Sequence, residues 1–364
     1  MEALFITNLE LNENEGIYKK IYAEATAIGK AVGSCNLLMK CGSGTKVVDT
    51  LSEKASIEEL NVLTLAQKYV EENSLKLIYI RLMVPNFSLI ALMKTAQQRG
   101  IKVLYEIPTY PYYGEQFRAS RKKYRAVAKI AVDAMFSPLI KKYADHIVII
   151  RSNSKIRLHH KMAEINNGVN TEKIKSKENY GSKDGVFRMV TVGTLFPYHG
   201  YDRVLAGLKD CKEEVDGHPV EFHIVGASQT IDELKEQAQK LGLKRVIFHG
   251  MKTTDELNEM YEDFDVGLGC LALHRRNADI DTTLKIIEYY CRGVPVVTSG
   301  KSPYKDPAVT IHIPDGEDPV DINSLYCKWK NIDEDKLRKL SEQAKKEFSW
   351  NFIMKQLLMA CGIV

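Results

Sequence analysis

Short apolar runs alternate with amphipathic segments along the whole chain, and polar turns separate them. In the first half, strand-like runs stand at residues 3–7, 35–39, 47–51, 77–80, 103–107 and 144–150. Helical patterns at 17–31, 57–70 and 89–98 lie between several of these runs. Repeated alternation of strands and helices favours a parallel, doubly wound α/β sheet, in which ligands bind at the carboxyl ends of the strands.

The second half repeats the alternation, and its strands run into glycine. The apolar runs 189–192, 222–225, 246–248 and 265–269 end at or near Gly193, Gly226, Gly250 and Gly269. Glycine lets the backbone turn sharply and lets a ligand approach it closely. Four such strand ends predict the edge of a cleft, most plausibly one that binds a nucleotide.

The stretch 279–300 follows the last of these strands and predicts a turn, a helix of about three turns and a buried strand. Thr282 and Thr283 are typical helix-starting residues, and Lys285 falls in the first turn. A helix start with free N–H groups and a lysine can bind an anion such as a diphosphate. Glu288, one turn further, could then reach a hydroxyl of the same ligand. An ordinary surface helix with a lysine and a glutamate remains the alternative.

Composition limits the class of protein. At 364 residues the chain favours two domains, and its 45% hydrophobic and 27% charged residues are typical of a soluble globular protein. The start of the chain does not resemble a secretory signal, and no apolar run approaches the ~20 residues that span a bilayer. Seven cysteines without CxxC spacing indicate reduced thiols rather than disulfides or a metal site.

Charge is divided unevenly between the two halves. Residues 1–183 hold 28 Lys and Arg against 18 Asp and Glu, a balance of +10, whereas the remainder holds 23 against 29, a balance of −6. Such asymmetry suggests that the first half meets an anionic surface or ligand.

The segment 107–129 combines tyrosines and a phenylalanine with a run of basic residues. This composition fits docking to a membrane surface with anionic lipids. The alternatives are a segment that binds single-stranded nucleic acid and an ordinary basic helix exposed to solvent. We expect no nucleic-acid partner. The predicted membrane-surface residues are Arg118, Arg121, Lys122, Lys123 and Arg125.

Other polar positions in the first half stand where substrates bind in α/β sheets. Arg81 and Glu106 end apolar strands, and Gly16 opens the first helix. A solvated charge or a plain turn glycine is the alternative for each of them. The candidate acceptor-binding residues are Gly16, Arg81, Glu106 and Tyr110.

Several familiar chemistries lack their motifs. The sequence contains neither GxxxxGK[ST] nor a strand followed by GxGxxG. The DxD at 279–281 is better explained by helix capping than by metal binding. We therefore expect no metal and no cofactor.

The order of these segments resembles the GT-B glycosyltransferases, specifically retaining family 4. The resemblance covers essentially the whole chain. It is carried by INNGVN, VGTLFPYHGYDR, FHIVG, IFHG, YEDFDVGLG, LKIIEYYCRGVPVV and FSW, at 165–170, 192–203, 222–226, 247–250, 261–269, 284–297 and 348–350. HGYDR and LKxxEY are most similar to enzymes that build capsule and exopolysaccharide repeat units.

The resemblance implies a GT-B fold with two Rossmann-like, doubly wound domains facing a central cleft. We expect an N-terminal acceptor-binding domain at 1–183 and a C-terminal donor-binding domain at 184–349, with a helix at about 350–364 packing back on the first. The polar, lysine-rich segment 171–185 is interpreted as the interdomain linker.

The family's site residues fall only partly on matching positions. Its glycine, arginine and lysine correspond to Gly193, Thr194 and His199, and Ile280 replaces the first of two glutamates, of which Glu288 is the second. The expected catalytic residues are Lys285, Arg203 and His199. The expected donor-binding residues are Gly193, Thr194, Gly200, Gly226, Met251, Arg275, Thr282, Thr283, Leu284 and Glu288.

The implied activity is transfer of a sugar, with retention, from a nucleotide-diphosphate sugar such as a UDP-sugar. The implied acceptor is a lipid-diphosphate-linked glycan of bacterial capsule assembly, on the inner face of the cell membrane. The departing diphosphate requires fixed positive charge and aligned amides rather than a strong nucleophile. A non-catalytic GT-B-like partner or glycan-binding protein and a sugar-nucleotide epimerase remain as alternatives.

Overall fold

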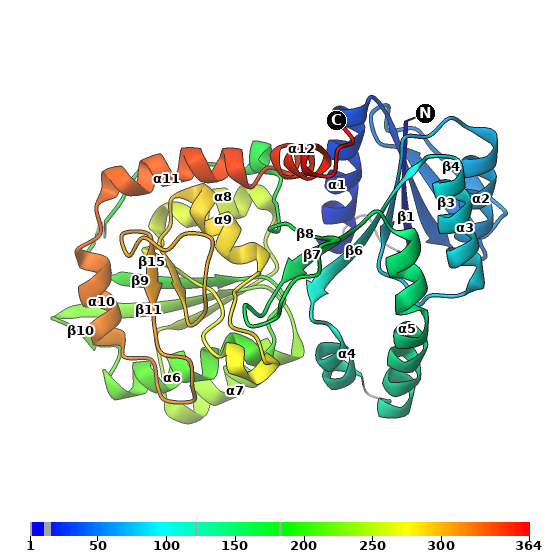
Figure 1. The fold of residues 1–364 in the computed structure, drawn as a ribbon. Coiled ribbons are helices and arrows are strands. Elements are labelled where there is room, and N and C mark those ends of the chain that lie inside the picture. Colours follow the sequence, from blue (N-terminus) through cyan, green and yellow to red (C-terminus); the bar gives the residue numbers. More distant parts are fainter. Residues whose placement is uncertain (1, 11–15, 121, 182–183) are drawn as a thin grey trace. The chain divides into compact units, whose positions relative to one another are not determined.

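The computed structural model describes residues 2–10, 16–120, 122–181 and 184–364 (Figure 1). These residues divide into two compact units. Unit 1 comprises residues 1–151, 155–168 and 349–364, and unit 2 comprises residues 152–154 and 169–348. The chain therefore leaves unit 1 before the predicted boundary at 183 and returns to it for its last segment.

Unit 1 is built on an eight-stranded sheet with the order β4-β3-β2-β1-β5-β6-β7-β8. The strands are β1 (Ala3–Glu10), β2 (Cys35–Cys41), β3 (Gly44–Asp49), β4 (Ala55–Glu58), β5 (Leu77–Arg81), β6 (Lys102–Tyr110), β7 (His146–Arg151) and β8 (Met162–Glu164). The pairs from β2 through β1 to β8 are parallel, as the alternating pattern predicted. The expected strand at 47–51 instead belongs to an antiparallel hairpin, because Gly42 turns the chain back with a φ of 58°.

Helices cover both faces of this sheet (Figure 1). They are α1 (Gly16–Val32), α2 (Val62–Glu72), α3 (Phe87–Gln98), α4 (Tyr113–Ala119), α5 (Lys123–Tyr143) and α12 (Trp350–Ala360). Helices α2, α3 and α5 pack on one face, whereas α1 and α12 pack on the other. The helix expected at 57–70 begins at Val62, because the residues before it form β4 and Asn61 caps the helix.

Unit 2 contains a seven-stranded sheet with the order β10-β11-β9-β13-β14-β15, in which β12 also pairs with β11. The strands are β9 (Phe187–Val192), β10 (Glu214–Val215), β11 (His218–Val225), β12 (Val246–Gly250), β13 (Val266–Leu268), β14 (Val296–Thr298) and β15 (Thr310–His312). All pairs except β10 with β11 are parallel. Their carboxyl ends consequently meet at one edge of the sheet, where the glycines stand.

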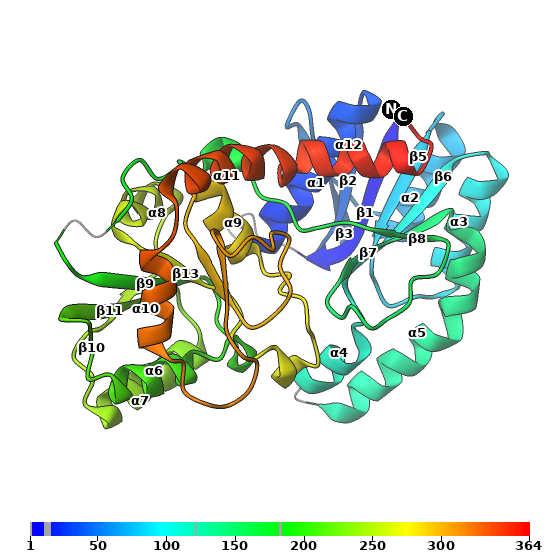
Figure 2. The same ribbon diagram turned by 60° about the vertical axis from the view of Figure 1, so that its left-hand side comes forward.

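Two layers of helices enclose the sheet of unit 2 (Figure 2). The helices are α6 (Tyr201–Asp210), α7 (Gln229–Leu241), α8 (Thr254–Met260), α9 (Leu284–Arg292), α10 (Ile322–Lys330) and α11 (Glu334–Glu347). Helices α6, α7 and α10 share one apolar core with the sheet, whereas α8, α9 and α11 share the other. Both units are thus Rossmann-like α/β layers, as predicted.

The segment 171–185, which we interpreted as an interdomain linker, belongs to unit 2 where the structure describes it. Ile174 is buried in the core beneath α9, and the Lys177 ammonium donates to the carbonyl of Phe264. The lysine-rich composition suggested a solvated linker, because the sequence does not distinguish a lysine that binds a carbonyl group from a lysine in solvent.

Candidate functional site

The carboxyl edge of the unit 2 sheet is formed by glycines whose backbones touch. The Gly193 N–H donates to Val225 O at 2.9 Å, and the Gly226 N–H donates to Gly250 O at 2.8 Å. Gly226 has a φ of 135°, and a Cβ built on it would lie 2.2 Å from the Gly193 carbonyl oxygen. No other residue fits there, so three adjacent strands end in bare backbone at the place where ligands bind in this architecture.

Lys285 directs a buried ammonium group toward this edge from the first turn of α9. Its Nζ donates to Tyr201 Oη at 3.1 Å and to Thr191 Oγ1 at 3.4 Å, and it lies 5.3 Å from the centre of the Tyr201 ring. Burial lowers the pKa of Lys285 to about 8, although Cys270, Asp281 and Glu288 act in the opposite direction. The group is therefore a cation without an ion-pair partner among the described residues, and an incoming anion can neutralise it.

Tyr201 fixes the position of this lysine. Its hydroxyl also bonds Thr191 Oγ1 at 2.6 Å and the carbonyl oxygens of Leu268 and Gly269 at 2.8 and 2.9 Å. These partners join β9, β13 and α6 around the ammonium. Tyr201 and Thr191 were not among the predicted site residues, because a buried tyrosine at the start of a helix is usually a core residue.

Asp281 organises the turn before α9. One carboxylate oxygen accepts from the N–H and hydroxyl of Thr283 at 3.1 and 2.7 Å. The other accepts from the Cys270 N–H at 2.7 Å and the Thr298 hydroxyl at 3.0 Å. Thr283 occupies the N-cap position without making a side-chain cap bond, so the first amides of α9 lack that internal acceptor. A helix start of this kind favours an anion.

Glu288 lies one turn beyond Lys285 and is half-buried. Among the described residues it has no hydrogen-bond or ion-pair partner in the structure. Burial raises the pKa of Glu288, whereas Arg292 and Lys285 act to lower it. A partly desolvated carboxylate can accept hydrogen bonds from the hydroxyl groups of a ligand. The neighbouring ammonium can bind an anionic group of the same ligand.

His199 does not supply the charge that the family's lysine would provide. It is buried, its Nδ1 accepts from the Phe196 N–H at 2.8 Å, and its ring stacks on Tyr201 with centroids 5.6 Å apart. Burial, followed by Lys285 and Arg276, lowers the pKa of His199 well below its usual range. The imidazole is consequently neutral near pH 7 and holds the turn before α6.

Two predicted arginines are used to fasten loops. Arg203 is buried and donates to the carbonyl oxygens of Leu271, Pro314 and Asp318. Arg275 makes a bidentate pair with Asp202 at 2.8 and 2.7 Å, bonds Glu317 and donates to Pro197 O at 2.7 Å. These bonds engage the five N–H groups of Arg275, so the structure does not favour the predicted donor contact.

The next residue, Arg276, is the arginine that lies beside the site. It stacks on Tyr198 with its guanidinium carbon 4.8 Å from the ring centre. Its charge also lowers the pKa of His199 and favours the thiolate of Cys270, as the charge of Lys285 does. Arg276 and Lys285 therefore act on the same two buried groups. Because Arg275 and Arg276 are adjacent in LHRRN, the sequence does not distinguish their roles.

The remaining predicted donor residues surround the same edge. Thr194 and Met251 are exposed and follow β9 and β12. Gly200 has a φ of 73° and lets the chain pass Ala272, whose Cβ would lie 2.8 Å from a Cβ at this position. Thr282 and Leu284 flank the N-cap of α9 and are half-buried.

The acidic pair of the DxD is used within the protein. Asp279 accepts from the Ser154 N–H at 2.7 Å and its hydroxyl at 2.5 Å, and it pairs with Lys301. The Ile280 N–H donates to the Ser152 carbonyl, and Ile280 forms an isolated parallel β-bridge with Lys301. An apolar residue therefore occupies the position of the family's first glutamate. Throughout the described chain, no three His, Cys, Asp or Glu side chains are grouped to hold a metal ion.

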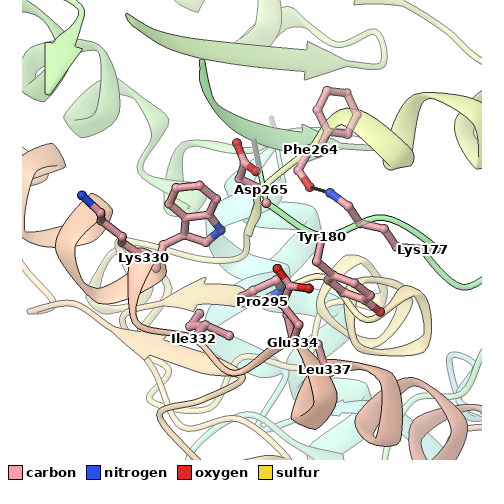
Figure 3. A pocket seen from close by; sticks show the side chains of 11 residues that line it. Lys177, Tyr180, Phe264, Asp265, Pro295, Lys330, Ile332, Glu334 and Leu337 are labelled. Atoms are coloured by element: carbon pink, nitrogen blue, oxygen red, sulfur yellow. Dashed lines mark hydrogen bonds between the residues drawn. The ribbon is translucent and has the colours of Figure 1, made fainter. Parts of the chain in front are cut away.

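A cavity of about 230 Å³ lies at the opposite edge of the unit 2 sheet, where β13 and β14 begin (Figure 3). Trp329, Tyr180 and Phe264 line it together with Asp265, whose pKa burial raises to about 6. Asp265 accepts from the Arg188 N–H at 2.8 Å. The 171–181 segment is attached through Lys177, whose ammonium donates to the Phe264 carbonyl and whose N–H donates to the Arg292 carbonyl at 2.8 Å.

The acceptor residues predicted in unit 1 do not form one site. Arg81 and Glu106 are buried partners, with Arg81 Nη1 3.0 Å from both carboxylate oxygens and 3.3 Å from Glu24. Lys20 completes this cluster, in which burial and then Glu106 raise the pKa of Glu24 to about 7. Arg81 and Glu106, which were predicted to bind the acceptor at the strand ends, therefore neutralise one another inside the protein. Gly16 is the first, exposed residue of α1, and Tyr110 ends β6 beside a cavity.

Three of the predicted membrane-surface residues lie at the start of α5, whereas Arg118 lies on α4 and Arg121 is outside the described residues. Lys122, Lys123 and Arg125 are exposed, and the side chain of Arg118 on α4 is not described. Large apolar side chains accompany them: Phe117, Tyr124 and Val127 are 41%, 68% and 53% exposed. Where the chain is described, none of its helices combines the length and apolar character required to cross a bilayer.

Residues 172–346 match the family described as Glycosyl transferases group 1. This match covers most of unit 2, and the two Rossmann-like units have the fold of GT-B glycosyltransferase structures. The site assembled above lies entirely within the matched residues.

Solved structures are similar in fold over both units. Sucrose-phosphate synthase from Thermosynechococcus elongatus has 14% identity and a TM-score of 0.62, covering 99% of this chain and 98% of its own. The lipopolysaccharide outer core galactosyltransferase WaaB has 13% identity and a TM-score of 0.61, covering 100% of both chains. A TarM variant from S. aureus has 15% identity and a TM-score of 0.50, covering 87% of this chain and 62% of its own. No curated protein matches the sequence.

Proposed function

We propose that this chain is a retaining glycosyltransferase that moves a sugar from a nucleotide-diphosphate sugar to a glycan acceptor. The main observation is the placement of Lys285 and Glu288 one turn apart on α9, at the glycine edge of the residues that match the group 1 family. The ammonium and the amides of the helix start suit a diphosphate, whereas the carboxylate suits ribose hydroxyls.

Arg276 completes the proposed donor site. The family's arginine and lysine are replaced by Thr194 and by His199, which is neutral, so Lys285 needs a second cation to match a diphosphate. The charge of Arg276 acts on His199 and Cys270, the groups that Lys285 also influences, and its guanidinium stacks on Tyr198. It therefore takes the role that we predicted for Arg275.

The proposed reaction breaks the bond between the anomeric carbon of the donor sugar and the diphosphate oxygen. The acceptor hydroxyl forms the new glycosidic bond, and the departing diphosphate takes the hydroxyl proton. Positive charge fixed around the phosphates stabilises the charge that develops as the bond breaks. No metal ion enters this proposal.

UDP is the first nucleotide to test. The S. aureus TarM structure was solved as a complex with UDP, which makes a UDP-sugar a reasonable donor for this chain. A thermal-shift screen against UDP-, GDP- and ADP-sugars identifies the donor, because a ligand that binds only the folded state raises its stability. NMR of the product then reports whether the anomeric configuration is retained.

Lys285→Ala provides the central test. We expect the loss of a buried, phosphate-facing ammonium to reduce transfer at least 100-fold, which corresponds to about 2.7 kcal/mol of transition-state stabilisation. Circular dichroism checks that the fold is intact, and Lys209→Ala on the exposed end of α6 is the matched control. Turnover near the normal rate in the Lys285 variant would contradict the phosphate role.

The proposed acceptor is a lipid-diphosphate-linked glycan of capsule assembly, used at the inner face of the cell membrane. This part of the proposal is supported by the exposed basic and apolar side chains at the start of α5.

Charge reversal at Lys122, Lys123 and Arg125 tests the membrane contact. We expect the triple glutamate variant to lose binding to vesicles with anionic lipid, because each basic residue near such a surface contributes about 1 kcal/mol. Reversal of Lys235, Lys240 and Lys244, which are exposed in unit 2, serves as the control. Absence of vesicle binding in the wild-type protein would remove the membrane proposal and leave the donor site untouched.

A non-catalytic GT-B partner subunit is the second candidate. It is favoured by the neutral, buried His199 and by Ile280, which replace charged residues of the family pattern. Sugar transfer or donor hydrolysis by the purified chain excludes this candidate, and conversion of the donor to an epimer would instead indicate an epimerase.

A further inference from the structure

A second cavity, in unit 1, lies between α5 and the segment that follows β6. Its volume is about 300 Å³, which is at the lower end of the range for small-molecule sites. Tyr110, Tyr112 and Tyr113 form an aromatic wall, and apolar residues of β6, β7 and α5 line the inner part. Nothing in the proposed donor chemistry uses this cavity, because the donor site lies in the other unit.

The polar groups of the cavity surround one carboxylate. Asp133, which is 7% exposed, accepts a hydrogen bond from the Tyr112 hydroxyl, and the Tyr113 ring centre lies 4.6 Å from that of Tyr112. A carboxylate has about four acceptor positions, so the bond from Tyr112 leaves capacity for further donors. Ser137, one turn along α5, adds a hydroxyl that can donate or accept.

This lining discriminates between classes of ligand. A buried carboxylate disfavours an anion such as a phosphate or a lipid headgroup phosphate. The ammonium of Lys141, which also lines the cavity, disfavours a quaternary ammonium group, although three tyrosines and an aspartate would otherwise suit one. A neutral ring with apolar faces and several hydroxyls matches both the aromatic wall and the carboxylate.

We propose that this cavity binds a neutral saccharide unit of the acceptor. The inference rests on the proposed function, because the acceptor of a glycosyltransferase provides the saccharide. It assigns Tyr110, Tyr112, Tyr113, Asp133 and Ser137 to a subsite that recognises a sugar other than the one being transferred.

Two leucine variants on α5 test the proposal as a matched pair. Ala134 lines the cavity and is exposed, so Ala134→Leu narrows the site without disturbing the core. Ala128 is exposed on the same helix and does not line the cavity, which makes Ala128→Leu the control. The probes are neutral oligosaccharides containing glucose, galactose, rhamnose or N-acetylglucosamine, with choline and glucose 1-phosphate as charged comparisons. Saturation-transfer NMR measures binding.

We expect at least one neutral probe to bind, Ala134→Leu to weaken it at least tenfold, and Ala128→Leu to leave it unchanged. UDP should not displace this probe. The proposal is overturned if no neutral probe binds, if choline or glucose 1-phosphate binds more tightly, or if Ala134→Leu has no effect.

Two outcomes distinguish a failure of the saccharide subsite from a failure of the proposed transferase function. Sugar transfer that is normal in Ala134→Leu, including its KM for acceptor, refutes the subsite and leaves the enzyme. Saccharide binding in a chain that transfers no sugar refutes the enzyme and leaves the cavity as a glycan-binding site.

Discussion

At the scale of single residues, burial of Lys285 lowers the pKa of its ammonium group at the proposed ligand site. Its ammonium is held by Tyr201 and Thr191, which are neutral, so the surroundings stabilise its position more than its charge. Burial consequently lowers its pKa from 10.5 to about 8. A diphosphate beside it restores a strong preference for the protonated form.

This coupling predicts a pH dependence for UDP binding. Below about pH 8 the free lysine is protonated and the affinity stays level, whereas above it the lysine must take up a proton in order to bind. We expect the affinity to fall toward tenfold per pH unit above 8. Calorimetry from pH 7 to 9.5, in buffers of different ionisation enthalpy, measures the affinity and the proton uptake together. A Lys285→Ala variant with the same pH dependence would assign the titration to another group.

At the same scale, the sequence shows which residues are charged. It does not show which of these charges face solvent and which form ion pairs within the protein. The shared position of Lys285 and Glu288 could be predicted because both lie on one short amphipathic helix. Arg275 could not, since its partners Asp202 and Glu317 are 73 and 42 positions away along the chain. The same limit applies to Arg81 and Glu106, which neutralise one another across adjacent strands.

At the scale of elements, the strand ends of unit 2 were the most predictable part of the site. Glycine after an apolar run is a local signal, and the contacts between Gly193, Gly226 and Gly250 explain why it was reliable. The boundary of unit 2 was not predictable, because the residues that fasten 171–181 to the sheet form bonds with distant elements.

Gly226→Ala tests the glycine edge. The φ of 135° and the 2.2 Å approach to the Gly193 carbonyl combine backbone strain with a direct clash. We expect a loss of about 3 kcal/mol or more in the free energy of unfolding, together with loss of UDP binding. Urea denaturation measures the loss.

Gly242→Ala is the control for that experiment. Gly242 also has a positive φ, of 69°, but open space surrounds its Cβ position. The expected cost there is about 1–2 kcal/mol. Equal costs at the two positions would show that the close approach of the strand ends contributes nothing.

At the scale of the whole molecule, the two units divide the chain unequally along its length. Unit 1 takes its first strands from the start of the sequence and α12 from the end, whereas unit 2 is nearly continuous. Trp350, Ile353, Met354, Leu357 and Leu358 of α12 are buried in the core of unit 1. The fold class and this returning helix were both predicted from the order of segments.

Deletion of residues 349–364 tests how far unit 1 depends on α12. Burial of one large apolar side chain contributes about 1.5–3 kcal/mol, so five of them contribute on the order of 10 kcal/mol. This is comparable to the ~5–15 kcal/mol that stabilises a whole domain. We expect hydrogen exchange to show that unit 1 loses protection while unit 2 keeps it and still binds UDP. Retained protection in β1 and β5 would contradict this expectation.

The return of the chain to unit 1 also sets an order of events during synthesis. The strands of unit 1 precede unit 2 in the chain, yet the part of the sheet face that α12 covers beside α1 stays open until residues 349–364 emerge from the ribosome. Unit 2 has by then left the ribosome complete and can already be folded. The half of the protein that is begun first is therefore finished last, and its apolar face is the surface that a chaperone would need to cover in the interval.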